Sequence, residues 1–103
     1  MKIAVCDDDI AELNNIYEIL NNYFEEKKYD IYISKFGSSV ELASIIQKEK
    51  FDIYILDIVM PVLSGMNLAT EIRSFDKASD IIFLTSSPEF AVESYCVKQL
   101  ITY

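Results

Sequence analysis

The sequence lacks several features on which common functional sites depend. It contains no histidine, only two cysteines, and only two glycines and two prolines among its 103 residues. Cys6 and Cys96 have no metal-binding spacing and no histidine to assist them, so both are expected to be reduced thiols. A glycine-rich phosphate loop is absent as well, which argues against a nucleotide site.

Long hydrophobic runs are also missing, because no uninterrupted apolar run exceeds four residues. A membrane-spanning helix needs about 20 such residues, so no membrane contact is expected. Asp7, Asp8 and Asp9 interrupt the apolar residues at the N-terminus, so no signal peptide is expected here. We therefore expect a cytoplasmic protein.

Positive charge is scarce, with 9 lysines and arginines against 17 acidic residues and a net charge of −8. This balance argues against direct binding of nucleic acid, which requires a basic face. It fits a protein that meets a cation or a basic partner surface. Hydrophobic residues make up 51% of the chain, enough for one small folded domain.

Short apolar segments alternate with segments of helical periodicity along the whole chain. This alternation predicts an α/β fold with an open parallel sheet and helices on both faces. Gly65 is expected to let the backbone turn into the third helix. The predicted strands are 2–6, 30–36, 51–56 and 81–85, and the predicted helices are about 9–27, 38–49, 66–75 and a short one from residue 87.

Acidic and hydroxyl residues stand directly after three of the predicted strands. Asp7 and Asp8 follow the first strand, Asp57 follows the third, and Thr85 ends the fourth. Each acid has a structural alternative, as a helix cap or a turn residue. Ligands of such sheets bind beyond the carboxyl ends of the strands, so these side chains converge if the first and third strands are neighbours.

Three carboxylates packed together repel one another unless a cation neutralises them. Mg²⁺ is the best candidate, because it takes one or two carboxylates and keeps several waters. With a metal beside it, Asp57 could attack phosphorus as a carboxylate nucleophile. The hydroxyl of Thr85 could then donate a hydrogen bond to a phosphoryl oxygen.

The motifs VCDDD, ILDIVMPVLSG and FLTSS, in this order, carry a family resemblance. The chain resembles the receiver domain of two-component response regulators, and SPEFAVESYCV is similar to receivers linked to LytTR-type DNA-binding domains. The resemblance implies a flavodoxin-like, CheY-like doubly wound sheet of order 2-1-3-4. It also implies that a histidine kinase phosphorylates Asp57. Mg²⁺ would then be held by Asp7, Asp8, Asp57 and the backbone carbonyl of Val59, and Thr85 would act as the switch hydroxyl.

The C-terminal part departs from the family pattern. Receivers carry a lysine at the end of a fifth strand, which family spacing places beyond the chain end, and then a fifth helix. The resemblance therefore implies one receiver domain over residues 1–103 that is incomplete at its C-terminus, with Tyr103 as a candidate switch aromatic. DNA would be reached only through a missing output domain that regulates transcription. Apolar surface left on the first helix predicts homodimerisation.

Two other functions remain open from the sequence. The chain could be a receiver-like interaction module that is not phosphorylated, which magnesium binding would distinguish. It could also be a phosphohydrolase with an aspartate nucleophile. Such enzymes place an acid two residues after the nucleophile, where this chain has Val59. We expect a signalling receiver that assists its own phosphorylation and dephosphorylation, and not an enzyme.

Overall fold

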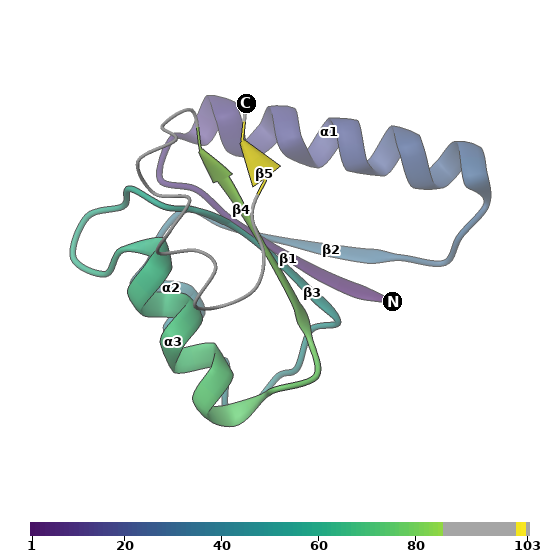
Figure 1. Cartoon of the computed structure of the whole chain (residues 1–103). Coiled ribbons are helices and arrows are strands. Elements are labelled where there is room, and N and C mark those ends of the chain that lie inside the picture. Colours follow the sequence, from purple (N-terminus) through teal and green to yellow (C-terminus); the bar gives the residue numbers. More distant parts are fainter. Residues whose placement is uncertain (86–100, 103) are drawn as a thin grey trace.

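A computed structural model describes the backbone of residues 1–85 and 101–102. These residues form a parallel sheet with α1 on one face and α2 and α3 on the other (Figure 1). The strand order is β2-β1-β3-β4-β5, which confirms the predicted 2-1-3-4 arrangement. The bounds are β1 Lys2–Cys6, α1 Ile10–Lys27, β2 Tyr32–Phe36, α2 Ser39–Ala43, β3 Ile53–Asp57, α3 Gly65–Phe75, β4 Asp80–Thr85 and β5 Ile101–Thr102.

The fifth strand is short within the described residues, where it pairs Ile101 with Leu84 and Thr102 with Thr85. The family resemblance implies that this strand and the fifth helix are partial or missing. The helix predicted from residue 87 lies outside the described residues. Within the part that the structure describes, no helix combines the length and apolar character needed to cross a bilayer.

The sheet separates two hydrophobic cores, because successive side chains of a strand point to opposite faces. In β1, Ala4 and Cys6 join the core beneath α2 and α3, whereas Ile3 and Val5 pack against α1. The four residues are between 0 and 1% exposed. This burial on both faces explains why the central strands read as continuous apolar runs.

The second helix is shorter than the sequence predicted. It ends at Ala43, not near Glu49. Beyond it the backbone tightens, since the Ile45 N–H donates to the Leu42 carbonyl at 3.1 Å and the Lys48 N–H donates to the Ile45 carbonyl at 2.9 Å. These bonds span three residues instead of four, which is the pattern of a tighter 3₁₀-type turn.

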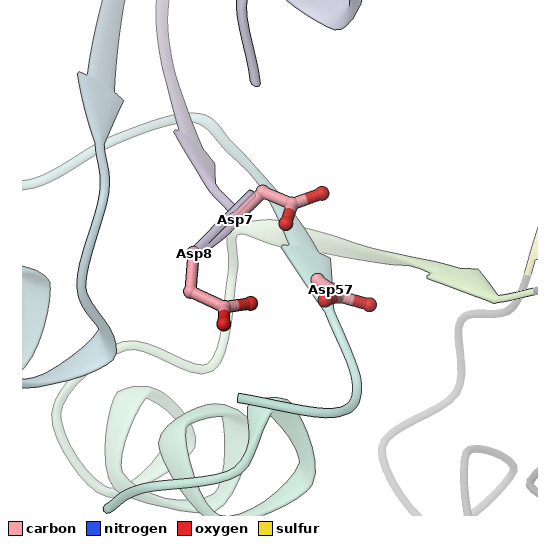
Figure 2. Close-up of side chains that lie close together, drawn as sticks. All are labelled: Asp7, Asp8 and Asp57. Carbon is pink, nitrogen blue, oxygen red and sulfur yellow. The ribbon is translucent and has the colours of Figure 1, made fainter. Parts of the chain in front are cut away.

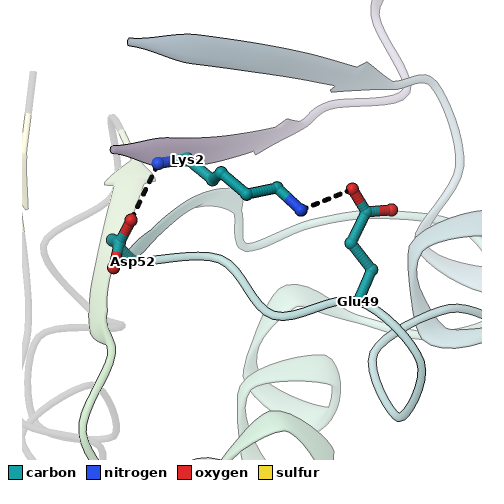
Figure 3. Close-up of polar contacts among 3 residues, drawn as sticks. All are labelled: Lys2, Glu49 and Asp52. Carbon is teal, nitrogen blue, oxygen red and sulfur yellow. Dashed lines mark hydrogen bonds and ion pairs between the residues drawn. The ribbon is translucent and has the colours of Figure 1, made fainter. Parts of the chain in front are cut away.

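The edge of the sheet at the amino-terminal ends of its strands is held by polar contacts of Lys2 (Figure 3). Its backbone N–H donates to Asp52 Oδ2 at 2.8 Å, and its Nζ lies 2.7 Å from Glu49 Oε1. Both partners of the ion pair are about two-fifths exposed, so the pair adds little stability, of order 0–1 kcal/mol. Its role is to tie the segment before β3 to β1.

An apolar cleft of about 380 Å³ lies between α1 and the sheet. Ile16, Ile19 and Leu20 of α1 line it together with Ile82 and Leu84 of β4. Ile19 is 59% exposed. Among the described residues, this agrees with the expectation of apolar surface on the first helix.

Candidate metal and phosphoacceptor site

Three carboxylates meet at the carboxyl-terminal edge of the sheet (Figure 2). Asp7 and Asp8 follow β1, and Asp57 is the last residue of β3. The strands β1 and β3 are hydrogen-bonded neighbours, with Cys6 opposite Leu56. One carboxylate oxygen from each of the three aspartates lies within 4.8 Å of the other two. The structure thus brings together the three acids that sequence reasoning selected.

Backbone hydrogen bonds fix the first acidic residues. The Asp7 N–H donates to the Phe36 carbonyl at 3.1 Å, and Asp7 Oδ1 accepts from the Asp9 N–H at 2.9 Å. Asp9 in turn caps α1, since its Oδ1 accepts from the N–H of Ala11 at 3.0 Å and of Glu12 at 3.3 Å. Asp9, the last of the three consecutive aspartates, is therefore the cap of α1, while Asp7 and Asp8 belong to the acidic cluster.

The electrostatics of the cluster favour the protonated form of two acids. Burial, and after it the charges of Asp7 and Asp8, raise the pKa of Asp57 to about 6, against the lowering effect of the backbone N–H groups of Ile58 and Val59. Burial also raises the pKa of Asp7, which is only 3% exposed. Two of the three acids are thus costly to ionise without a compensating charge.

The donor set fits a hard divalent cation. All three ligands are carboxylate oxygens, which Mg²⁺ and Ca²⁺ prefer. No nitrogen ligand is at hand, because the chain has no histidine. The one described thiol nearby, Cys6, is buried and points into the core beneath α2 and α3, with its pKa raised by burial to about 12. The chemistry of the site therefore selects an oxygen-binding metal.

The loop from β3 to α3 is pinned closely beneath Asp57. Ile58 and Met60 are buried, and the Gly65 N–H donates to the Ile58 carbonyl at 2.8 Å. A Cβ at Gly65 would overlap the backbone carbonyl of Asp57. The reason for glycine here is thus a close approach of two backbone segments and not the turn that the sequence predicted, since its φ is not positive.

Sequence reasoning missed Val62 in this loop. Its φ is 69°, and the Leu63 N–H donates to the Pro61 carbonyl at 2.7 Å across it. This is a γ-turn with positive φ, a rare and strained conformation for a β-branched residue. In the sequence, the position is marked only by a valine between Pro61 and the residues Leu-Ser-Gly. This pattern does not indicate a positive φ.

The structure describes the remaining predicted site residues only in part. The backbone of Thr85 ends β4, next to β3, and pairs with Thr102, while its side chain is outside the described residues. Tyr103 is also outside the described residues. Val59 follows the Asp57 strand in the loop, with its side chain 65% exposed.

Comparison with known proteins agrees with this geometry. Residues 3–100 match the family model of the response regulator receiver domain. The accessory gene regulator protein A of Staphylococcus aureus (strain N315) is 32% identical over 101 residues, which cover 95% of this chain and 42% of that protein. The chain thus spans about two-fifths of the length of these curated relatives.

Solved structures show the same fold. The response regulator TrrA of Thermotoga maritima, crystallised in complex with Mg(2+)-BeF, matches with a TM-score of 0.78 and 29% identity, covering 99% of this chain and 85% of that one. A response regulator receiver domain protein from Clostridium thermocellum matches with a TM-score of 0.80 and 25% identity, covering 98% of this chain and 80% of that one. The chain therefore belongs to the response regulator receiver domain family, whose members are signalling modules of two-component systems.

Proposed function

We propose that this receiver accepts a phosphoryl group on Asp57 from the phosphohistidine of a partner kinase. The observation that carries the proposal is the meeting of Asp7, Asp8 and Asp57 within 4.8 Å at the carboxyl edge of the sheet. A cluster of this kind is unfavourable for a structural role alone, because the acids repel one another and two of them are partly desolvated. The repulsion and desolvation of the carboxylates would be offset if the site binds a cation, which in turn attracts a phosphoryl group.

In the proposed step, a carboxylate oxygen of Asp57 attacks phosphorus as the nucleophile. A bond forms between that oxygen and phosphorus, and the bond between phosphorus and the histidine nitrogen of the donor breaks. The electron pair of the broken bond stays on the imidazole, which takes up a proton. The products are an acyl phosphate on Asp57 and a neutral histidine on the kinase.

Asp7, Asp8 and Asp57, with the backbone carbonyl of Val59, are proposed to hold Mg²⁺, Asp7 through a metal-bound water. The ion, when bound, would neutralise the carboxylates and attract the phosphoryl oxygens. The hydroxyl of Thr85 is proposed to donate to a phosphoryl oxygen, because its strand ends beside β3. Tyr103 is proposed to be the aromatic residue of the switch.

The output of the switch is proposed to be transcription, delivered through a further DNA-binding domain and not by this acidic domain. The name of the accessory gene regulator relative supports this assignment. The proposal places the domain in the cytoplasm as a receiver and not as a turnover enzyme. The exposed, apolar Val59 supports the second part, that the domain is not a turnover enzyme, because a valine cannot serve as the general acid of a phosphohydrolase.

Intact-mass measurement after incubation with acetyl phosphate and Mg²⁺ tests the acceptor role. The wild-type chain is expected to gain one phosphoryl group, and the Asp57→Asn variant none. Omission of Mg²⁺ should also abolish the gain. Equal modification of both proteins would show that another residue is the acceptor, and no modification of the wild type would refute the proposal.

A further inference from the structure

Two exposed valines follow Asp57 on the loop between β3 and α3. Val59 is 65% exposed and Val62 is 93% exposed, the most exposed large apolar side chain among the described residues. Single exposed apolar residues are ordinary, but these two lie on one short loop directly after Asp57. Val59 stands only two residues after Asp57, so the loop borders the reacting group itself.

The loop presents these side chains from a fixed base. Met60, between them, is 7% exposed, and its Sδ lies 3.6 Å from Cys6 Sγ in the core. The Ser39 hydroxyl donates to the Pro61 carbonyl at 3.4 Å from the buried start of α2. Anchors on both sides therefore hold the loop while Val59 and Val62 face solvent.

The fold itself gains nothing from the side chain at position 62. The γ-turn places Val62 at a φ of 69°, which glycine or asparagine adopts more easily than valine. The side chain is almost fully exposed, so packing within the domain does not compensate the strain. A valine here is favourable only where something outside the domain covers it.

We propose that Val59 and Val62 form an apolar docking surface for the protein that donates the phosphoryl group, which meets them with apolar side chains beside its phosphohistidine. The inference rests on the proposed acceptor role of Asp57. The location favours this occupant, because a donor histidine must reach Asp57 over the loop that follows it. The acidic cluster beside the valines requires that the donor surface carry no excess of negative charge.

The test compares a small donor with a protein donor. Acetyl phosphate needs no docking surface, whereas a kinase does. From a panel of purified sensor-kinase cores phosphorylated on histidine, the core that transfers fastest to the wild-type chain serves as the protein probe. The variant is Val62→Asn, since asparagine accepts a positive φ and replaces the apolar side chain with a polar one.

Val62→Asn is expected to slow transfer from the kinase at least tenfold, while labelling by acetyl phosphate stays within twofold of wild type. Its melting temperature should be equal to or above that of wild type, because strain is relieved. The matched control is Val40→Asn, which changes a valine that is 48% exposed in the groove between α2 and α3. This control should leave both rates unchanged.

Unchanged kinase transfer by Val62→Asn would overturn the docking surface. So would a panel in which no kinase labels a wild-type chain that acetyl phosphate does label. Slower labelling by both donors would assign Val62 to the chemistry instead and would likewise overturn the proposal. If neither donor labels Asp57 in the wild-type chain, the acceptor role fails, which is a distinct outcome.

Discussion

Binding of Mg²⁺ should depend steeply on pH, because the ion and protons compete for the same carboxylates. The pKa of Asp57 is raised to about 6, and only the ionised form is a ligand. At pH 5 about one Asp57 in eleven is ionised, whereas at pH 7.5 nearly all are, by the standard titration relation. The apparent Kd should therefore be at least about tenfold weaker at pH 5, and the raised pKa of Asp7 acts in the same direction.

The stability of the metal-free protein should change with pH in the opposite direction to Mg²⁺ binding. The folded pKa of Asp57 lies above its ordinary value of 3.8, so the folded state binds more protons than the unfolded state between these two values. Stability of the metal-free protein should thus fall as the pH rises from about 4 to about 6. Adding Mg²⁺ at pH 7.5 should restore it, since a ligand that binds only the folded state stabilises that state.

Isothermal titration calorimetry at pH 5.0 and 7.5, with thermal unfolding in parallel, measures both effects. Asp57→Asn should bind more weakly at pH 7.5 and show a shallower pH dependence. Asp30→Asn, at an exposed position away from the cluster, should behave as wild type. Equal Kd values within twofold at the two pH values in the wild-type protein would refute the reasoning.

Two further predictions concern the scaffold. Gly65→Ala should lower the free energy of unfolding by about 1–3 kcal/mol or more, because the added Cβ overlaps the Asp57 carbonyl, whereas the exposed Asn67→Ala on the same helix should change it by less than about 0.5 kcal/mol. Urea titration measures both, and equal stability of the two variants would contradict the close-approach argument. The chain should self-associate through the cleft beside α1, and Ile19→Glu should weaken the association in light scattering. A wild-type monomer at high concentration would contradict this.

The acidic cluster was predictable from sequence because it depends on topology. Once the periodicity gives alternating strands and helices and the family resemblance gives the order 2-1-3-4, the residues after β1 and β3 are expected to meet at one edge, and Asp7, Asp8 and Asp57 do so. Asp9 caps α1 from the position directly before its apolar stripe, where an aspartate is a favourable cap. These inferences need only strand order and local propensity.

Other features depend on backbone packing that no local pattern encodes. The early end of α2 follows from the tight turns after Ala43, where the sequence predicted a helix as far as residue 49. The role of Gly65 depends on how near β3 approaches the start of α3. The positive φ of Val62 contradicts valine's own preference, so propensity points away from it.

The buried thiol of Cys6 can serve as an internal probe of how often the domain opens. It is 1% exposed and lies directly before the acidic pair, and its pKa near 12 keeps it protonated at neutral pH. Alkylating reagents attack thiolates, so they should reach this sulfur only when the central strand separates from α2 and α3. The rate at which Cys6 is alkylated would then report how often the sheet beneath Asp57 separates from these helices, in a protein that has no tryptophan to signal the event by fluorescence.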